Sequence, residues 1–309
     1  MISAFNLIDF YKFIIFCVHE PKILIIKEKK DEIERYYENY QNNILEEVEQ
    51  YLEKLEMTKS ERLFLNGIVC EIKPKKILEV GVAGGESSIV ILNAIKDISD
   101  AQLYSIDKNE SYYRDENCKT GYLVEKLPHL KNKWKLYTGG TTASFIEDIV
   151  IRPGEGEIDL CLLDTVHSCP GELLDILMIL PFMKKEGIVV LHDIQYNNCL
   201  IKNGISNNVL FSVIKAEKIL PEISEHYING VPYPNIGAFK INEETLKHVD
   251  DIFFALSLNW EYLPDKEDMG IMRKLFVKYY NKENVLKFDK CYEFYKKEFE
   301  NTATFSKEI

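Results

Sequence analysis

The sequence lacks several features that would each point to a class of function. Its seven cysteines include no Cys-x-x-Cys pair, so neither a zinc site of that type nor a disulfide framework is indicated, and free thiols in a reducing compartment are expected. Basic residues are in deficit, with 38 Lys and Arg against 50 Asp and Glu and a net charge of −12. Because nucleic-acid phosphates would be repelled, we expect no nucleic-acid partner. These absences favour a cytoplasmic protein.

Long hydrophobic runs are also absent. The most apolar stretch near the N-terminus, residues 5–26, is interrupted by Asp9, Lys12, Glu20 and Pro21, whereas a membrane-spanning helix needs about 20 mostly apolar residues. This stretch has neither a basic leader nor a small-residue cleavage site. We therefore expect no transmembrane span. Packing of the stretch on the main domain is favoured over a peripheral membrane or partner contact.

Residues 1–58 are predicted to form an N-terminal helical arm. Within residues 27–57, which are highly charged, the apolar residues are spaced as on one face of a helix; they are Ile44, Leu45, Val48, Leu52 and Leu55. Such a helix suits an arm on the same chain or a dimerisation helix, so a homo-oligomer formed through the N-terminal helices is one expectation. A further helix over residues 59–72 should end before Pro74, because proline cannot continue a helix interior.

Between residues 77 and 241, segments typical of strands and of helices alternate. The expected strands are 77–81, 102–107, 134–138, 158–164, 187–192 and 235–241, with a weaker one near 223–228. The expected helices are 86–97, 120–127, 142–150, 171–183 and 206–220. Two of the strands are apolar almost to their last residues, as strands buried on both faces of a parallel sheet are. We predict an α/β fold for residues 59–242: a Rossmann-like, doubly wound, mostly parallel seven-stranded sheet with N- and C-terminal helical extensions.

Residues 243–309 are predicted to form a C-terminal helical cap, because the alternation stops there. Helices are expected over residues 243–256 and 270–300. The second helix places aromatic residues on one face; they are Phe288, Tyr292, Tyr295 and Phe299. Docking of this aromatic face on the main domain is favoured over contact with a partner or a membrane surface.

The segment ILEVGVAGGES, residues 77–87, is the most informative part of the chain. A strand runs into a glycine turn and a helix follows, the arrangement that holds nucleotides in doubly wound folds. Glycine lets the turn close tightly and lets a ligand approach the backbone. The spacing Glu79-x-Gly81-x-x-x-Gly85 differs from the G-x-G-x-x-G of nicotinamide binders. It resembles the E-x-G-x-x-x-G signature of class I S-adenosylmethionine (SAM) methyltransferases, and the alternative is a tight structural turn.

A SAM site implies a particular set of cofactor-binding residues. Glu79, at the end of the first strand, suits the methionine ammonium group. Asp107, the next carboxylate at a strand end, lies where a ribose would bind. The following strand ends on a small polar loop suited to an adenine, which contains Gly139 and Thr141. The predicted cofactor-binding residues are therefore Glu79, Gly81, Gly85, Asp107, Gly139 and Thr141.

The next two strands end on titratable residues, Asp164 and His167 after one strand and His192 and Asp193 after the other. Ligands bind at this edge of open α/β sheets. One interpretation is a divalent metal site, with carboxylates suited to Mg²⁺ or Mn²⁺ and His192 as a third ligand that favours Mn²⁺ or Fe²⁺. Another is metal-free general-base catalysis by His167 or His192. The third is structural: Asp164 caps the following helix and His192 is hydrogen-bonded in the core.

The pattern Asp164-x-x-His167, followed by His192-Asp193, resembles the metal-dependent sugar O-methyltransferases that modify macrolides. It is also similar to the wider SAM methyltransferase group that includes cephalosporin-hydroxylase-like proteins. The resemblance covers residues 65–241 and implies Asp164 and Asp193 as metal ligands and His167 as the catalytic base. The chain departs from the pattern at His192, where the family often has Glu or Asp.

These observations predict a SAM-dependent O-methyltransferase that acts on a hydroxyl of a small polar substrate, a sugar or glycoconjugate. The expected catalytic residues are His167 and Asp164, the expected metal ligands are Asp164, Asp193 and His192, and the expected cofactors are SAM and Mg²⁺ or Mn²⁺. Three alternatives stay open. They are a metal-dependent hydroxylase-like enzyme of the same superfamily, a nicotinamide-dependent oxidoreductase, and a non-catalytic scaffold of the SAM fold in glycan assembly.

Overall fold

The structure is a computed structural model, and it describes residues 46–52, 56–150, 157–195, 205–222 and 224–305. At its centre lies a seven-stranded sheet of order β5-β2-β1-β6-β7-β11-β8. The strands are β1 (Lys76–Val80), β2 (Gln102–Asp107), β5 (Trp134–Thr138), β6 (Ile158–Leu163), β7 (Met183–His192), β8 (Glu217–Ile219) and β11 (Ile236–Lys240). The pairs from β5 to β7 are parallel, and β11 is antiparallel to both of its neighbours. The predicted α/β fold with a mostly parallel sheet is confirmed.

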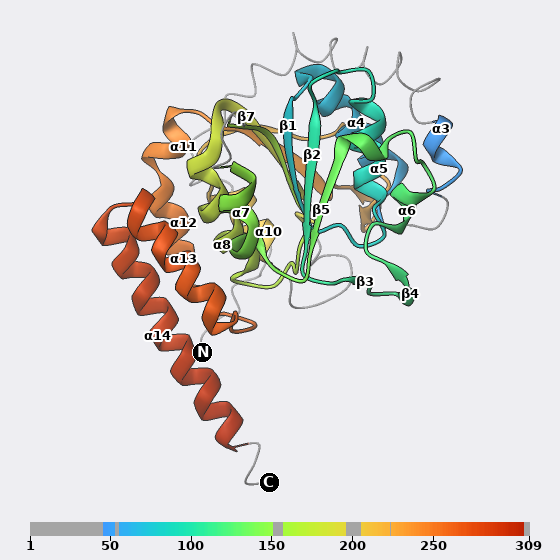
Figure 1. Cartoon of the computed structure of the whole chain (residues 1–309). Helices are drawn as coiled ribbons and strands as arrows, with labels where there is room; N and C mark the ends of the chain where they lie inside the picture. The colour runs from blue at the N-terminus through green and yellow to red at the C-terminus, as the bar shows by residue number, and fades with distance from the viewer. Residues whose placement is uncertain (1–45, 53–55, 151–156, 196–204, 223, 306–309) are drawn as a thin grey trace.

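Helices cover both faces of the sheet (Figure 1). One face carries α4 (Lys59–Ile72), α5 (Glu86–Ala94) and α6 (Tyr122–Glu125), and the other carries α7 (Thr142–Val150), α8 (Gly171–Ile179) and α10 (Ser206–Val213). Successive residues of β1 supply the two cores, with Ile77 packed on the α4–α5 side and Leu78 on the α7–α8 side. A strand with apolar residues on both faces is therefore buried from both sides.

The edge of the sheet next to β11 differs from the sequence-based expectation. The predicted helix 206–220 ends at Val213, and residues 217–219 form the edge strand β8. The strand expected near 223–228 is not in the sheet, since β9 (Tyr227–Ile228) pairs with β10 (Val231–Pro232) in a separate hairpin. Charged residues such as Glu217 and Lys218 protect an edge strand from pairing with other chains. Because these residues also favour helices, the sequence pattern of β8 was misleading.

Short elements connect the main ones. They are α3 (Glu46–Glu49), the hairpin of β3 (Ser111–Tyr112) and β4 (Asp115–Lys119), and the 3₁₀ turns Lys131–Lys133 and Leu180–Phe182. Val48 in α3 and Leu52 just after it are buried in the core beside α4 and α5. These two residues pack on their own chain, but α3 ends at Glu49, so the helix expected within residues 27–57 does not continue through residues 50–52. Ile44, Leu45 and Leu55, and the stretch 5–26, lie outside the described residues. Within the described part of the chain, no helix is both long and apolar enough to cross a bilayer.

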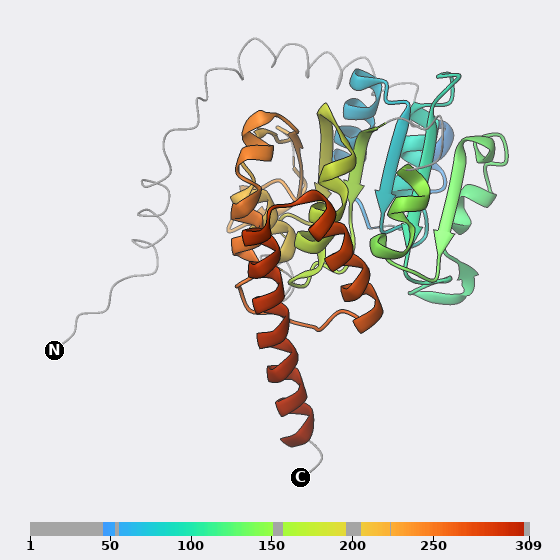
Figure 2. The same ribbon diagram turned by 60° about the vertical axis from the view of Figure 1, so that its left-hand side comes forward.

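The C-terminal residues form a cap against the α7–α8 side of the sheet (Figure 2). Its helices are α11 (Glu243–Lys247), α12 (Val249–Ala255), α13 (Lys266–Tyr279) and α14 (Lys282–Phe305). The expected helix 270–300 is thus two helices, separated at Tyr280 and Asn281.

The aromatic face of α14 docks as predicted. Phe288 meets Phe276 edge-to-face, with ring centroids 4.9 Å apart. Tyr295 stacks on Trp260 at 5.0 Å, and its hydroxyl donates to the carbonyl oxygen of Leu258 at 2.8 Å. The remaining two members, Tyr292 and Phe299, are half-buried against the same core. The cap is therefore joined to the sheet domain by a continuous hydrophobic core.

Replacement of Phe288 tests how much the packing of the cap contributes to the free energy of unfolding. Phe288 is 1% exposed, whereas Phe294 on the same helix is 58% exposed. Phe288→Ala should lower the free energy of unfolding by about 3–5 kcal/mol, because it leaves a cavity between α13 and α14. Phe294→Ala should change it by no more than about 0.5 kcal/mol. Urea unfolding followed by circular dichroism gives both values, and equal losses would contradict the docked arrangement.

Candidate functional site

The glycine turn after β1 brings three strand ends together. Gly81 has φ +92°, and a Cβ on it would lie 1.7 Å from the carbonyl oxygen of Asp164. Only glycine tolerates both this backbone conformation and this close approach. Its N–H donates to the carbonyl oxygen of Ile106 at 2.9 Å, at the end of β2. The predicted need for glycine at position 81 is therefore explained by chain packing as well as by ligand access.

Asp107 holds the same turn from the end of β2. Its Oδ2 accepts hydrogen bonds from the N–H groups of Val82 and Ala83, both at 2.9 Å. Its Oδ1 accepts from the N–H of Asn109 at 2.8 Å. The carboxylate lines a cavity of about 750 Å³ that opens at the carboxyl ends of the strands. This is the position expected for a group that binds a ribose.

Glu79 requires a correction, because it does not line this cavity. Its side chain is fully buried on the α5 side of β1, and it accepts hydrogen bonds of 2.6–2.7 Å from Ser87, Ser88 and Ser105. Burial raises the pKa of this carboxyl to about 7, although the serine hydroxyls oppose the shift. Glu79 therefore anchors the first turn of α5 and the neighbouring strand β2.

Two of the predicted glycines also lie outside the lining. Gly85 has φ +91° and packs against Gly121, whose Cα would lie 3.0 Å from an added Cβ. Gly139 has φ +78° and faces Glu110. The next residue in the loop, Gly140, lines the cavity together with the predicted Thr141. Of the six predicted cofactor-binding residues, the structure thus places Gly81, Asp107 and Thr141 at the cavity.

The rest of the cavity wall comes from segments that the sequence did not indicate. The β3–β4 hairpin contributes Tyr112, Tyr113 and Arg114, and the cap contributes Tyr262, Asp265, Asp268 and Met272. Lys108, which follows β2, forms a 3.1 Å ion pair with Asp265 of the cap. Neither segment carries a recognisable motif, so only the folded chain shows that they border the site.

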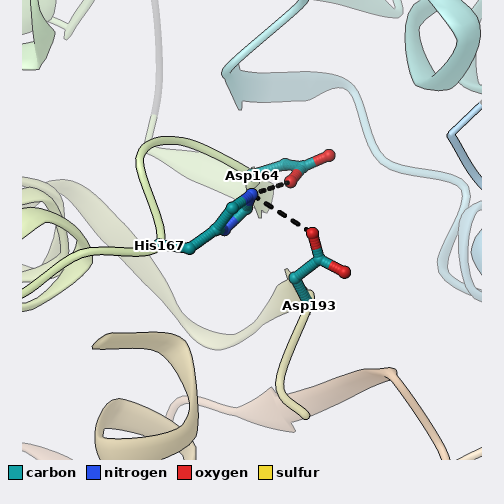
Figure 3. A group of neighbouring side chains, drawn as sticks. All are labelled: Asp164, His167 and Asp193. Carbon is teal, nitrogen blue, oxygen red and sulfur yellow. Dashed lines mark ion pairs between the residues drawn. The ribbon is translucent and has the colours of Figure 1, made fainter. Parts of the chain in front are cut away.

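Four titratable residues meet at the ends of β6 and β7, and we call Asp164, His167, His192 and Asp193 the Asp–His cluster. The Nε2 atom of His167 lies 3.6 Å from Asp164 and 3.2 Å from Asp193, the two contacts drawn as dashed lines in Figure 3. The Nδ1 atom of His192 lies 3.3 Å and 3.7 Å from the same two carboxylates. The sequence-based prediction that these residues gather at one edge of the sheet is confirmed.

The cluster is held in place by neighbours that the sequence did not reveal. Glu172, buried at the start of α8, accepts from the backbone N–H of His167 at 2.7 Å and lies 3.5 Å from its Nδ1. Asn235, just before β11, donates to Asp193. His167 and Asp193 both have left-handed backbones, with φ of +56° and +55°. Such conformations are uncommon outside glycine, although Asp and His adopt them more readily than other residues, and they concentrate at functional sites.

The two histidines differ in their access to the cavity. The side chain of His167 is 17% exposed, and that of His192 is 4% exposed. Neither ring nitrogen of His192 has a hydrogen-bond partner in the described structure. His167 can therefore meet a bound molecule, whereas His192 lies beneath the carboxylates with its Nδ1 directed toward them.

The charges of the cluster compensate one another. Burial opposes protonation of His167, but Glu172, Asp164 and Asp193 outweigh it and raise the pKa of His167 to about 9. His192 shows the same balance, and its pKa is raised by Asp164 and Asp193. The pKa of Asp164 is lowered by both imidazoles despite its burial.

These residues fit a divalent cation. Asp164, His167 and Asp193 each offer a ligand atom within 4.8 Å of the others, and Nδ1 of His192 faces the same two carboxylates. Both imidazoles thus approach the two carboxylates, His167, the predicted base, as closely as His192, the predicted third ligand. Oxygen and imidazole donors together suit Mn²⁺ or Fe²⁺ better than Mg²⁺.

Comparison with known proteins supports the resemblance of the glycine turn to that of methyltransferases. Residues 78–194 match the sequence model of a methyltransferase domain. No curated protein matches the chain. The matched segment contains the glycine turn, Asp107 and the whole Asp–His cluster. The match agrees with the prediction that this part of the chain is a methyltransferase domain.

Several solved methyltransferases have a similar fold. The O-methyltransferase TomG from Streptomyces achromogenes, in complex with SAM, is 17% identical; the match covers 77% of this chain and 96% of that one, with a TM-score of 0.43. An O-methyltransferase from Bacillus cereus, in complex with SAH, is 12% identical, with 76% and 98% covered and a TM-score of 0.43. The SAH-bound methyltransferase PaMTH1 from Podospora anserina is 13% identical, with 79% and 99% covered and a TM-score of 0.42.

Proposed function

We propose that this methyltransferase modifies a hydroxyl group of a small polar molecule, a sugar or glycoconjugate, with the help of a divalent cation. The observation that carries the proposal is that one cavity contains both the glycine turn with Asp107 and the Asp–His cluster. A cavity of about 750 Å³ lies within the range of small-molecule and cofactor sites. It offers space for a methyl donor at one end and an acceptor beside a base at the other.

The cofactor end is built from the turn and the strand ends around it. Bound SAM would supply an electrophilic methyl group. Asp107 would accept hydrogen bonds from ribose hydroxyls, since its carboxylate is at the end of β2 and faces the cavity. Gly81 keeps the turn close to β6, and Thr141 borders the side where the adenine would lie.

At the acceptor end, the chain's own groups can orient a hydroxyl and take its proton. A divalent cation held by Asp164, Asp193 and His192 would lower the pKa of a nearby substrate hydroxyl. His167 is the proposed base, because its side chain is the histidine of the cluster that is open to the cavity. Glu172 lies behind its Nδ1 and can fix the orientation of the ring.

The chemistry of the wall supports a polar acceptor. Carboxylates and tyrosines border the cavity on the side of the hairpin and the cap, and such residues hydrogen-bond hydroxyl groups and stack on sugar rings. A panel of sugars and nucleotide sugars, set against a panel of catechols, tests this assignment through the release of SAH. Turnover confined to catechols would contradict the sugar proposal and leave the methyltransferase assignment intact.

Removal of Asp107 should weaken cofactor binding. Asp107→Ala should make the binding free energy of SAH less favourable by about 1.5–3 kcal/mol, which is the contribution of hydrogen bonds to a charged group. Asp107→Asn should lose less, because an amide oxygen can still accept from the turn. Asp115→Ala, in the exposed strand β4, is the control and should bind as the unmodified protein does. Titration calorimetry measures all four, and equal affinities would exclude Asp107 from the ribose site.

Chelation tests the metal site. EDTA should abolish turnover, and Mn²⁺ should restore it. Asp193→Asn should weaken Mn²⁺ binding at least about tenfold, because it removes a charged ligand, whereas Asp265→Asn in the same cavity should not. Electron paramagnetic resonance of free Mn²⁺ measures the binding directly. Full turnover in excess EDTA, with no bound metal by elemental analysis, would favour the metal-free base mechanism.

The pH dependence tests the role of His167. A base must be neutral, and the pKa of His167 is raised to about 9 by the surrounding carboxylates. Without a cation, any turnover should therefore increase with pH through about 9. With Mn²⁺ this rise should move to lower pH, because a nearby positive charge disfavours the imidazolium.

Substitution of the base completes that test. His167→Ala should reduce kcat by about 10²–10⁴-fold and leave the Kd for SAH almost unchanged. His192→Ala should mainly weaken Mn²⁺ binding. The assignment of the base fails if His167→Ala keeps the acid limb of the pH profile or the turnover of the unmodified protein.

A further inference from the structure

Glu61 lies directly behind the Asp–His cluster, although it belongs to α4 near the start of the described chain. We propose that Glu61 is a positioning residue that holds the imidazole of His192 with Nδ1 toward the cation site and Nε2 as an N–H donor. This inference rests on the proposed metal-assisted function. It adds a residue outside the segment that matches the methyltransferase domain, which begins at residue 78.

The surroundings of His192 leave few ways to orient its ring. The backbone is fixed, since its carbonyl oxygen accepts from the side chain of Asn207 at 2.7 Å. On one side, Nδ1 faces Asp164 and Asp193 at 3.3 Å and 3.7 Å. On the other side, Nε2 faces Oε2 of Glu61 at 3.6 Å. The ring is buried, so water cannot replace these contacts freely.

Glu61 is itself fixed before it meets His192. Its Oε2 accepts from the backbone N–H of Thr58 at 2.6 Å and from the Thr58 hydroxyl at 2.9 Å, which completes the capping box of α4. Its Oε1 lies 2.9 Å from Nε2 of His226, in the loop before β9. The carboxylate is 3% exposed. These three contacts restrict the orientation of the buried carboxylate, so it can act as a fixed hydrogen-bond acceptor.

The consequence for His192 follows from the chemistry of imidazole. A histidine that binds a metal through one nitrogen usually donates its other N–H to a carboxylate or carbonyl, which sets the tautomer and makes the ligand more basic. Among the described residues, Glu61 is the acid that approaches Nε2 of His192. The proton therefore belongs on Nε2, and the lone pair belongs on Nδ1, the nitrogen that faces Asp164 and Asp193.

The same arrangement explains how a histidine, in place of a third acid, can serve as a ligand beside Asp164 and Asp193. An acid at position 192 would bring its own negative charge to the site. Glu61 supplies that charge from behind the ring, and the ligand atom becomes a nitrogen. The site is then completed by α4, so its metal affinity depends on the position of that helix.

A purely structural role for Glu61 in the capping box is the competing explanation, and Thr58→Ala is its control. This variant removes the side-chain cap of α4 and the hydroxyl contact to Glu61, but it keeps the carboxylate that faces His192 and the bond from the backbone N–H of Thr58 to it. Glu61→Ala and Glu61→Gln are the test variants, the second keeping an acceptor for Nε2. All are made in the full chain, stripped with EDTA, and titrated with Co²⁺ while the visible absorption spectrum is recorded.

The expected results separate the two roles. Glu61→Ala should bind Co²⁺ about 10–100-fold more weakly, as losses of such supporting carboxylates do, and with a changed spectrum. Glu61→Gln should recover part of the affinity. Thr58→Ala should melt at a lower temperature but keep the affinity and spectrum of the unmodified protein. Equal Co²⁺ affinity and spectrum in Glu61→Ala would overturn the role of Glu61 and leave the metal site standing.

A second measurement uses the unmodified protein, so it does not depend on the folding of a variant. In the unmodified, ¹⁵N-histidine-labelled protein loaded with Zn²⁺, nitrogen–proton correlation spectra should show His192 protonated at Nε2 and metal-bound at Nδ1. The reverse tautomer would overturn the proposal. If the unmodified protein binds none of these cations, both the proposed metal site and the role of Glu61 are wrong.

Discussion

The contact between Gly81 and the backbone of Asp164 is the constraint on which the site depends. It joins the turn after β1 to the end of β6, and a side chain of any size at position 81 would force the two apart. The N–H of Asp164 also donates to the carbonyl oxygen of Val80 at 2.9 Å. The cofactor end and the acidic end of the cavity are therefore parts of one rigid junction between neighbouring parallel strands.

Buried charge is the second constraint, and it accounts for residues that come from distant parts of the chain. Burying a carboxylate or an imidazolium without partners costs several kcal/mol. The cluster avoids this cost by pairing two aspartates with two histidines and by placing Glu172 and Glu61 behind the rings. The two histidines are thus supported alike. The two side chains differ in their exposure to the cavity. His167 is the more exposed of the two, as the proposed base must be, whereas the buried His192 suits the role of a metal ligand.

Much of the fold and part of the site were predictable because they depend on local patterns. Apolar runs located the parallel strands, and the residues that end those strands had to meet at one edge, which correctly gathered Asp164, His167, His192 and Asp193. The orientation of a side chain at a strand end was not predictable in the same way. Glu79 lies on a fully buried strand with serines beside it, and the strand's alternation turned it toward α5 and away from the cavity. The sequence of edge strand β8 resembled that of a helix, because the charged residues that keep an edge strand from pairing with other chains also favour helices.

Residues such as Glu61, His226 and Asn235 could not be found from the sequence, because no local pattern links them to the cluster and only the folded chain brings them there.

The acceptor side of the cavity could not be predicted from the sequence either. Its cap residues, Tyr262, Asp268 and Met272, lie beyond the segment that matches the methyltransferase domain. The matched segment contains the glycine turn and the Asp–His cluster. The proposed acceptor site is bordered in part by elements outside that segment, so a match to a methyltransferase domain alone leaves the substrate open. Because the cap shares a continuous core with the sheet domain, the packing of the cap sets the position of the cavity wall that faces the proposed acceptor.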